Sequence, residues 1–145
     1  NLEYLDVFFK ARKGSISPKK YAKYINSCEI AISTCQHDDL QFFNGRFIGM
    51  TFNKFYEIPM CNSLHVAQRS ADLEDLGFED GVNVVLFDSF PECVEKINYY
   101  LKNKNEMNEI VQSSIELVRE RHTYKRRVQN FLVDLEIFFD IKNIL

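Results

Sequence analysis

Four short β-rich runs recur along the chain, and segments with helical features separate them. The runs cover residues 5–9, 29–34, 63–68 and 82–87. Short apolar runs of this kind are typical of buried strands, and strands that alternate with helices are typical of a parallel sheet. The sequence therefore predicts an α/β fold, a Rossmann-like parallel sheet with helices on both faces. The length suits a single domain over residues 1–145.

The helix predicted at the centre of the chain covers residues 52–61. Pro59 falls inside it and cannot donate the usual backbone hydrogen bond, so we expect the helix to begin late or to kink there. Asn62 follows, and asparagine is second only to glycine in the left-handed conformation that ends many helices. Ligands of parallel sheets bind beyond the carboxyl ends of the strands, and we expect the amino end of this helix to point there.

The other helices are predicted from caps and from apolar residues at helical spacing. Ser17 and Pro18 suit the N-cap and the first position of a helix over residues 17–27. Pro91 begins a helix that runs to residue 101, and two more helices close the chain. The side chains that we expect to face the core are Tyr21, Tyr24, Ile25 and Cys28; Val94, Ile97 and Leu101; Met107, Ile110, Val111, Ile115 and Val118; and Val128, Phe131, Leu132, Leu135, Phe138 and Phe139.

The charge and cysteine content limit the classes of function. The net charge of −3 gives no electrostatic argument for a nucleic acid or an anionic membrane as partner. No apolar run approaches the roughly 20 residues that a membrane-spanning helix needs. The four cysteines form no CxxC pair, and we expect reduced thiols in a cytoplasmic protein. Because the chain does not begin with methionine, we expect it to be part of a longer protein.

Two groups of residues resemble metal ligands. Two cysteine–histidine pairs could act together as zinc ligands, Cys35 with His37 and Cys61 with His65. Their spacing matches no standard zinc site. Asp38 and Asp39 could hold a metal ion, but adjacent carboxylates in a polar loop are usually solvated. We therefore predict no metal site.

The central helix carries a basic and an acidic residue three positions apart. Lys54 and Glu57 would lie on one face of a helix and could present opposite charges to one ligand. This arrangement suits a nucleotide diphosphate, with a cation for the phosphates and a carboxylate for the ribose hydroxyls. The same spacing is typical of an ordinary surface ion pair, and spacing alone leaves both interpretations open.

Several segments together resemble a known family. Residues 53–61 read Asn-Lys-Phe-Tyr-Glu-Ile-Pro-Met-Cys and are similar to an Arg-x-x-Glu-x-x-x-Cys-Gly segment of GT-B glycosyltransferases. The step from helix to strand at 24–32, the turn and strand at 80–87, and the His-Thr-Tyr-x-x-Arg sequence at 122–127 match in order and spacing. The chain resembles the C-terminal, donor-binding half of these enzymes, in the CgeB-like branch of the group 1 transferases.

This resemblance implies a substrate and a site. In GT-B enzymes two Rossmann-like domains enclose a cleft, and the C-terminal half holds the sugar nucleotide. Glu57 would bind the donor ribose and Lys54 would lie near the diphosphate, with Thr51 and Asn53 at the amino end of the same helix. The expected function is metal-independent sugar transfer from a UDP- or GDP-sugar, without a cofactor.

The acceptor would be bound by an N-terminal domain that we expect to lie outside this chain. The catalytic base would also come from that domain, so no catalytic residue is assigned. We expect the fragment alone to be inactive.

Two residues depart from the family pattern and support an alternative. Lys54 stands where arginine is usual, and it keeps the charge but loses the bidentate fork. Asn62 replaces the usual glycine. Both would fit a Rossmann-like interaction domain that has lost nucleotide binding. A receiver-like signalling domain is a third interpretation, but it requires acidic residues at the end of the first strand, whereas Asp6 lies at its start.

Other polar residues have structural interpretations beside functional ones. His122 could be catalytic, but a role in orienting the junction between the last two helices suits it better, and Tyr124 would pack there too. His65 lies on a predicted buried strand and is expected to be structural. The basic residues of 119–127 could bind nucleic acid, but the net acidic charge argues against this, and a solvated helix face or an interdomain contact is expected.

Overall fold

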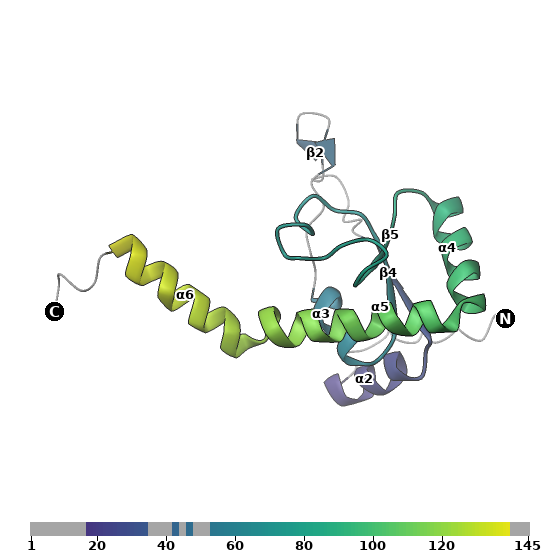
Figure 1. Cartoon of the computed structure of the whole chain (residues 1–145), viewed down its shortest axis with the longest axis horizontal. Coiled ribbons are helices and arrows are strands. Elements are labelled where there is room, and N and C mark those ends of the chain that lie inside the picture. Colours follow the sequence, from purple (N-terminus) through teal and green to yellow (C-terminus); the bar gives the residue numbers. More distant parts are fainter. Residues whose placement is uncertain (1–16, 35–41, 44–45, 48–52, 140–145) are drawn as a thin grey trace.

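The computed structural model describes residues 17–34, 42–43, 46–47 and 53–139, and its centre is a three-stranded parallel sheet (Figure 1). The elements, in chain order, are α2 (Pro18–Asn26), β1 (Ile30–Ser33), β2 (Phe42–Phe43), β3 (Arg46–Phe47), α3 (Lys54–Met60), β4 (Leu64–Gln68), β5 (Val85–Phe87), α4 (Phe90–Lys102), α5 (Lys104–Leu117), the π-helix η1 (Val118–His122) and α6 (Tyr124–Phe139). The strands of the sheet lie in the order β1–β4–β5, so β4 is the middle strand. A separate antiparallel pair joins β2 to β3.

Side chains alternate between the two faces of the sheet, and each face has its own apolar core. One core is formed with α4 and α5, and its strand residues are Leu64, Val66, Val85 and Phe87. The other core is formed with α3 and the segment after β4, and it contains Phe55, Ala67, Leu73 and Leu86. The predicted α/β fold, with a parallel sheet, helices on both faces and two helices at the end, is confirmed.

The central helix α3 lies within the range predicted for it. Phe55, Ile58 and Pro59 are buried along one side of the helix. Pro59 lies in the last turn of α3, where it donates no backbone hydrogen bond, and the helix ends at the next residue. Asn62 has a φ of 61°, and its N–H donates to the Pro59 carbonyl at 2.8 Å. The predicted left-handed end of the helix is confirmed.

The strands are shorter than predicted, and one of them is less buried. β5 begins at Val85 because residues 81–83 form a turn, in which Gly81 has a φ of 75°. We expect β1 to be buried, but among the described strands it has a neighbour only in β4, and Ile32 is 47% exposed. The strand predicted at residues 5–9 lies outside the described residues. A β-rich run predicts a strand, but it does not predict whether a neighbour lies on both sides.

The predicted inward faces of α2 and α4 are only partly right. α2 forms as predicted, and Tyr21, Ile25 and Cys28 are half-buried, but the helix contributes no fully buried residue and Tyr24 is exposed. α4 turns Cys93, Tyr100 and the predicted Ile97 toward the core, whereas the predicted Val94 and Leu101 are 42% and 41% exposed. Both sets have helical spacing, and the position of the sheet decides between them, which periodicity alone cannot give.

The last two helices differ in how they pack. All five residues predicted to face inward from α5 and the first position of η1 are buried, as expected. α6 forms over the predicted region but extends away from the sheet (Figure 1). Its apolar residues Val128, Phe131 and Leu132 are all more than half exposed, so their predicted burial is wrong. No helix in the described part of the chain has both the length and the apolar character needed to cross a bilayer.

Candidate functional site

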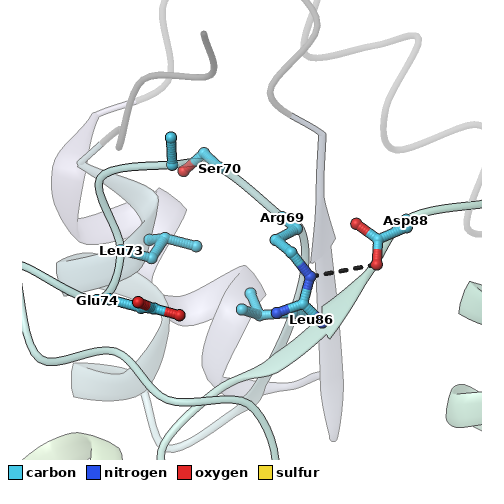
Figure 2. Close-up of a pocket in the computed structure, with 7 residues that line it drawn as sticks. Arg69, Ser70, Leu73, Glu74, Leu86 and Asp88 are labelled. Carbon is cyan, nitrogen blue, oxygen red and sulfur yellow. Dashed lines mark hydrogen bonds and ion pairs between the residues drawn. The ribbon is translucent and has the colours of Figure 1, made fainter. Parts of the chain in front are cut away.

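A pocket opens where two neighbouring strands end. β4 is followed by Arg69 and Ser70, and β5 is followed by Asp88, so these residues meet at the carboxyl edge of the parallel sheet. Leu73 and Glu74, from the segment after β4, complete a cavity of about 360 Å³ (Figure 2). This is the edge at which ligands bind in open α/β sheets, and the volume lies within the range of small-molecule sites.

Arg69 lies at this pocket, but two carboxylates hold its guanidinium. Its Nε donates to Asp88 at 3.2 Å (Figure 2), and its Nη2 donates to Asp80 at 3.0 Å. Burial lowers the pKa of Arg69, but the hydrogen bonds and charges of Asp88 and Asp80 outweigh burial and raise it. The side chain is therefore a cation that is already paired with two carboxylates.

Asp80 connects Arg69 to α4. One of its oxygens accepts a hydrogen bond from the Leu86 N–H at 2.7 Å, and the other is 3.1 Å from the Lys96 ammonium. Lys96 also pairs with Glu92 at 3.0 Å and donates to the Leu86 carbonyl. Burial raises the pKa of Asp80. The hydrogen bond from the Leu86 N–H and the charge of Lys96 together outweigh burial, so the pKa is lowered. This network ties the end of β5 to α4 and fixes one wall of the pocket.

Of the residues predicted as the ligand site, Lys54 and Glu57 lie on α3, and all that the structure describes are exposed. Thr51 is outside the described residues. Asn53 precedes the helix, and its side chain makes no capping hydrogen bond. Among the described residues, no ion pair joins Lys54 to Glu57, so the ordinary surface pair that the spacing allowed does not form. Because α3 has only seven residues, its dipole is small. The positive charge at the amino end of this helix therefore comes mainly from the Lys54 side chain.

Glu57 and Lys54 face different neighbours. The pKa of Tyr21 on α2 is raised by burial, then by the Glu57 and Cys61 charges and a side-chain hydrogen bond to Glu57. Burial and Glu57 also raise the pKa of Cys61. Glu57 thus lies near α2, whereas the charge of Lys54 acts on His65.

His65 is buried beneath α3. Its Nε2 is hydrogen-bonded to Ser33 Oγ at 2.8 Å, and the Phe55 ring contacts it edge-on at 4.5 Å. Within the described part of the chain, its Nδ1 has no hydrogen-bond partner. Burial, followed by the positive charge of Lys54, lowers the pKa of His65 to about 3, so the ring is neutral at physiological pH.

His122 lies at the junction between the last two helices. Its Nε2 donates to the Leu76 carbonyl at 2.8 Å, and its Nδ1 accepts from Arg127 at 3.3 Å. The ring stacks on Phe78 at 5.5 Å with a 9° interplanar angle. Arg127 also donates to the Tyr56 hydroxyl of α3 at 2.7 Å. The expected structural interpretation fits these contacts, because both ring nitrogens have protein partners. Tyr124 does not pack there, since it is 91% exposed.

The alternative metal ligands lie partly outside the described residues, including Cys35, His37, Asp38 and Asp39. In the ranges that the structure describes, no three His, Cys, Asp or Glu side chains gather as a metal site requires. The pocket residues Arg69, Glu74 and Asp88 were not predicted from the sequence. For Arg69 and Asp88 the available signal was their position directly after strands 63–68 and 82–87, in a fold whose ligands bind at that edge. Glu74 lies six positions after the first of these strands and has no such signal.

Comparison with known proteins gives one match. A family model described as glycosyl transferase-like matches residues 4–133. No match was found among curated proteins or among solved structures.

Proposed function

The chain belongs to the glycosyl transferase-like family, and we propose that it is the donor-binding domain of a GT-B glycosyltransferase of the CgeB-like branch. It would bind a UDP- or GDP-sugar and transfer the sugar without a metal ion, together with an N-terminal acceptor domain. The observation that carries this proposal is the cavity of about 360 Å³ at the carboxyl edge of a parallel sheet, in a chain of this family.

Lys54 and Glu57 are the residues proposed to hold the nucleotide. Lys54 is exposed and has no carboxylate partner among the described residues, so its ammonium is available to a phosphate. Glu57 would accept the ribose hydroxyls, and Asn53 and Thr51 would contact the phosphates beside Lys54. Oriented charges of this kind stabilise a departing nucleotide diphosphate, which is the main electrostatic demand of sugar transfer.

Calorimetry with UDP, GDP, CDP, dTDP and ADP, with and without magnesium, tests the proposal. We expect one diphosphate to bind without magnesium. Lys54→Met should weaken it by about tenfold, because a hydrogen bond to a charged group contributes roughly 1.5–3 kcal/mol and Lys54 is exposed. Glu57→Gln should have a similar effect on nucleotides and none on inorganic diphosphate, which lacks a ribose. Lys102→Met, at the end of α4, is the matched control.

Two results would contradict the proposal. Equal affinity of wild type, Lys54→Met and Glu57→Gln for every nucleotide would show that neither side chain binds the nucleotide. Binding of none of the five diphosphates to the chain, at millimolar concentrations and in both metal conditions, would remove the donor-binding function.

The alternative is an interaction domain that has lost nucleotide binding. Two observations favour it: Glu57 already has a neighbour in Tyr21, and α6 exposes a row of apolar side chains. This alternative predicts that Glu57→Gln changes the titration of Tyr21 but changes no nucleotide affinity. The calorimetric series therefore separates the two functions.

A further inference from the structure

The pocket at the carboxyl edge of the sheet has a net negative lining. Arg69 is its only cation among the described lining residues, whereas Glu74 and Asp88 contribute one negative charge each, so the sum is 1 − 2 = −1. Asp80 pairs with Arg69 from outside the lining, and Lys96 offsets its charge, so the excess within the lining is that of Glu74. An anionic group entering the pocket would face this excess of negative charge.

The cation of the pocket is already paired with two carboxylates. Asp88 and Asp80 accept from its Nε and Nη2 at 3.2 Å and 3.0 Å. A phosphate or carboxylate that approached the guanidinium would lie beside both of them, and like charges at such distances repel. The existing ion pairs therefore oppose anion binding here.

Glu74 faces the pocket from the opposite wall. Its side chain extends from the segment after β4 toward Leu86 (Figure 2). No hydrogen bond or ion pair of the Glu74 carboxylate occurs within the described residues, so its oxygens are available to donors on a ligand. The buried side chains of Leu73 and Leu86 supply the apolar part of the wall, against which the C–H face of a sugar ring can pack.

We propose that this pocket holds the sugar of the donor and that its negative lining selects an uncharged sugar over a sugar acid. The inference rests on the proposed donor-binding function, and it adds the class of sugar. Glu74 and Asp88 accept hydrogen bonds from sugar hydroxyls, and the same carboxylates repel a carboxylate on the sugar ring. The diphosphate lies outside the pocket, near Lys54.

Matched donor pairs that differ only at C6 of the sugar test the charge selection. UDP-glucose is compared with UDP-glucuronate, and GDP-mannose with GDP-mannuronate, by calorimetry on the whole chain and by ligand-observed NMR. For the nucleotide that binds, we expect the neutral donor to bind about three- to tenfold more tightly, because one added charge lies near one unpaired carboxylate in a partly hydrated pocket. The ratio should fall when salt is raised from 0.05 to 0.5 M, since salt screens exposed charges.

Glu74→Gln is the diagnostic variant, because it removes the charge and keeps the shape and exposure of the side chain. It should bring the ratio of neutral to acidic donor affinity near one. Glu109→Gln, an exposed position on α5 outside the pocket, should keep the wild-type ratio. The melting temperature of each variant shows that it is folded.

The outcomes separate the inference from the function on which it rests. Equal affinity for the two donors, or tighter binding of the sugar acid, in a wild-type chain that binds both would overturn the inference and leave the donor-binding function standing. UDP or GDP binding as tightly as its sugar conjugates would also overturn it, because the sugar would then contribute no net binding free energy. Failure of every nucleotide and donor to bind would remove the donor-binding function and the inference with it.

Discussion

Replacing Arg127 with methionine should loosen the attachment of α6 to α3. Arg127 donates to the Tyr56 hydroxyl at 2.7 Å, and its guanidinium lies 5.0 Å from the centre of the Tyr56 ring. It also donates to His122 Nδ1 at 3.3 Å. Methionine keeps most of the aliphatic contact and removes all three polar interactions, so the change isolates the charged group.

The expected loss follows from these contacts. The hydrogen bond to Tyr56 is worth about 1 kcal/mol, less than the roughly 1.5–3 kcal/mol usual for charged groups, because the position is exposed. The bond to His122 is not counted, because at 3.3 Å it is longer than a typical hydrogen bond. An exposed cation–π contact adds about 0.5–1 kcal/mol. The free energy of unfolding should therefore fall by about 1.5–2 kcal/mol in Arg127→Met. For a chain of this size the melting temperature should drop by about 3–8 °C.

Urea unfolding followed by circular dichroism measures this loss, since the chain has no tryptophan to serve as a fluorescent probe. A double-mutant cycle with Tyr56→Phe should give a coupling energy of at least about 0.5 kcal/mol, because the two groups touch. Arg126→Met is the matched control, since the only side chain bonded to the Arg126 guanidinium among the described residues is Gln129, at 3.5 Å. Strict additivity of Arg127→Met and Tyr56→Phe, or an equal loss in Arg126→Met, would refute the reasoning.

Three further predictions concern the core and its ionisation. The pKa of His65 is lowered in the folded state to about 3, so the unfolded chain binds protons first as the pH falls below about 6.5. The free energy of unfolding should therefore be unaffected by this histidine above that pH. Between that pH and pH 4 it should fall by up to about 1.4 kcal/mol per pH unit. His65→Gln should flatten that slope in a series of urea titrations, and an unchanged slope would contradict the assignment. Asn62→Ala should lower the free energy of unfolding by about 1 kcal/mol because of the positive φ, whereas Asn62→Gly should leave it unchanged. Equal losses in the two variants would refute the left-handed cap. Phe55→Ala should cost about 3–5 kcal/mol because the ring is fully buried, while Phe90→Ala, at a position 78% exposed, should change stability by under about 0.5 kcal/mol; similar melting temperatures of the two would contradict this packing.

The fold follows from local patterns that the sequence shows directly. The runs 29–34, 63–68 and 82–87 each contain an observed strand, and their alternation with helices is enough to predict a parallel sheet. The positive φ of Asn62 also follows from a local rule. The inward face of α4 does not, because two residue stripes have helical spacing and only the position of the sheet decides between them.

The edge that carries the pocket was predictable, but the residues that charge it were not. Arg69 bonds to Asp80 and Asp88, which are 11 and 19 positions away, and Lys96 reaches Asp80 across 16 positions. None of these separations has the short spacing that marks a helix face or a hairpin. The sequence could indicate residues next to strand ends, but it could not show that the cation among them is already neutralised.

The His-Thr-Tyr-x-x-Arg segment now has a physical account that does not require catalysis. A general base needs a nitrogen free to take a proton, but Nε2 of His122 donates to Leu76 and its Nδ1 accepts from Arg127. Burial, with a contribution from the Arg127 charge, lowers the pKa of His122, although the bond to Leu76 opposes the shift. Arg127 also donates to the hydroxyl of Tyr56, which lies between Lys54 and Glu57 along α3. This junction therefore contacts the helix that carries the proposed nucleotide ligands, and the His122 ring packs against Tyr56 at 5.0 Å and Phe78 at 5.5 Å.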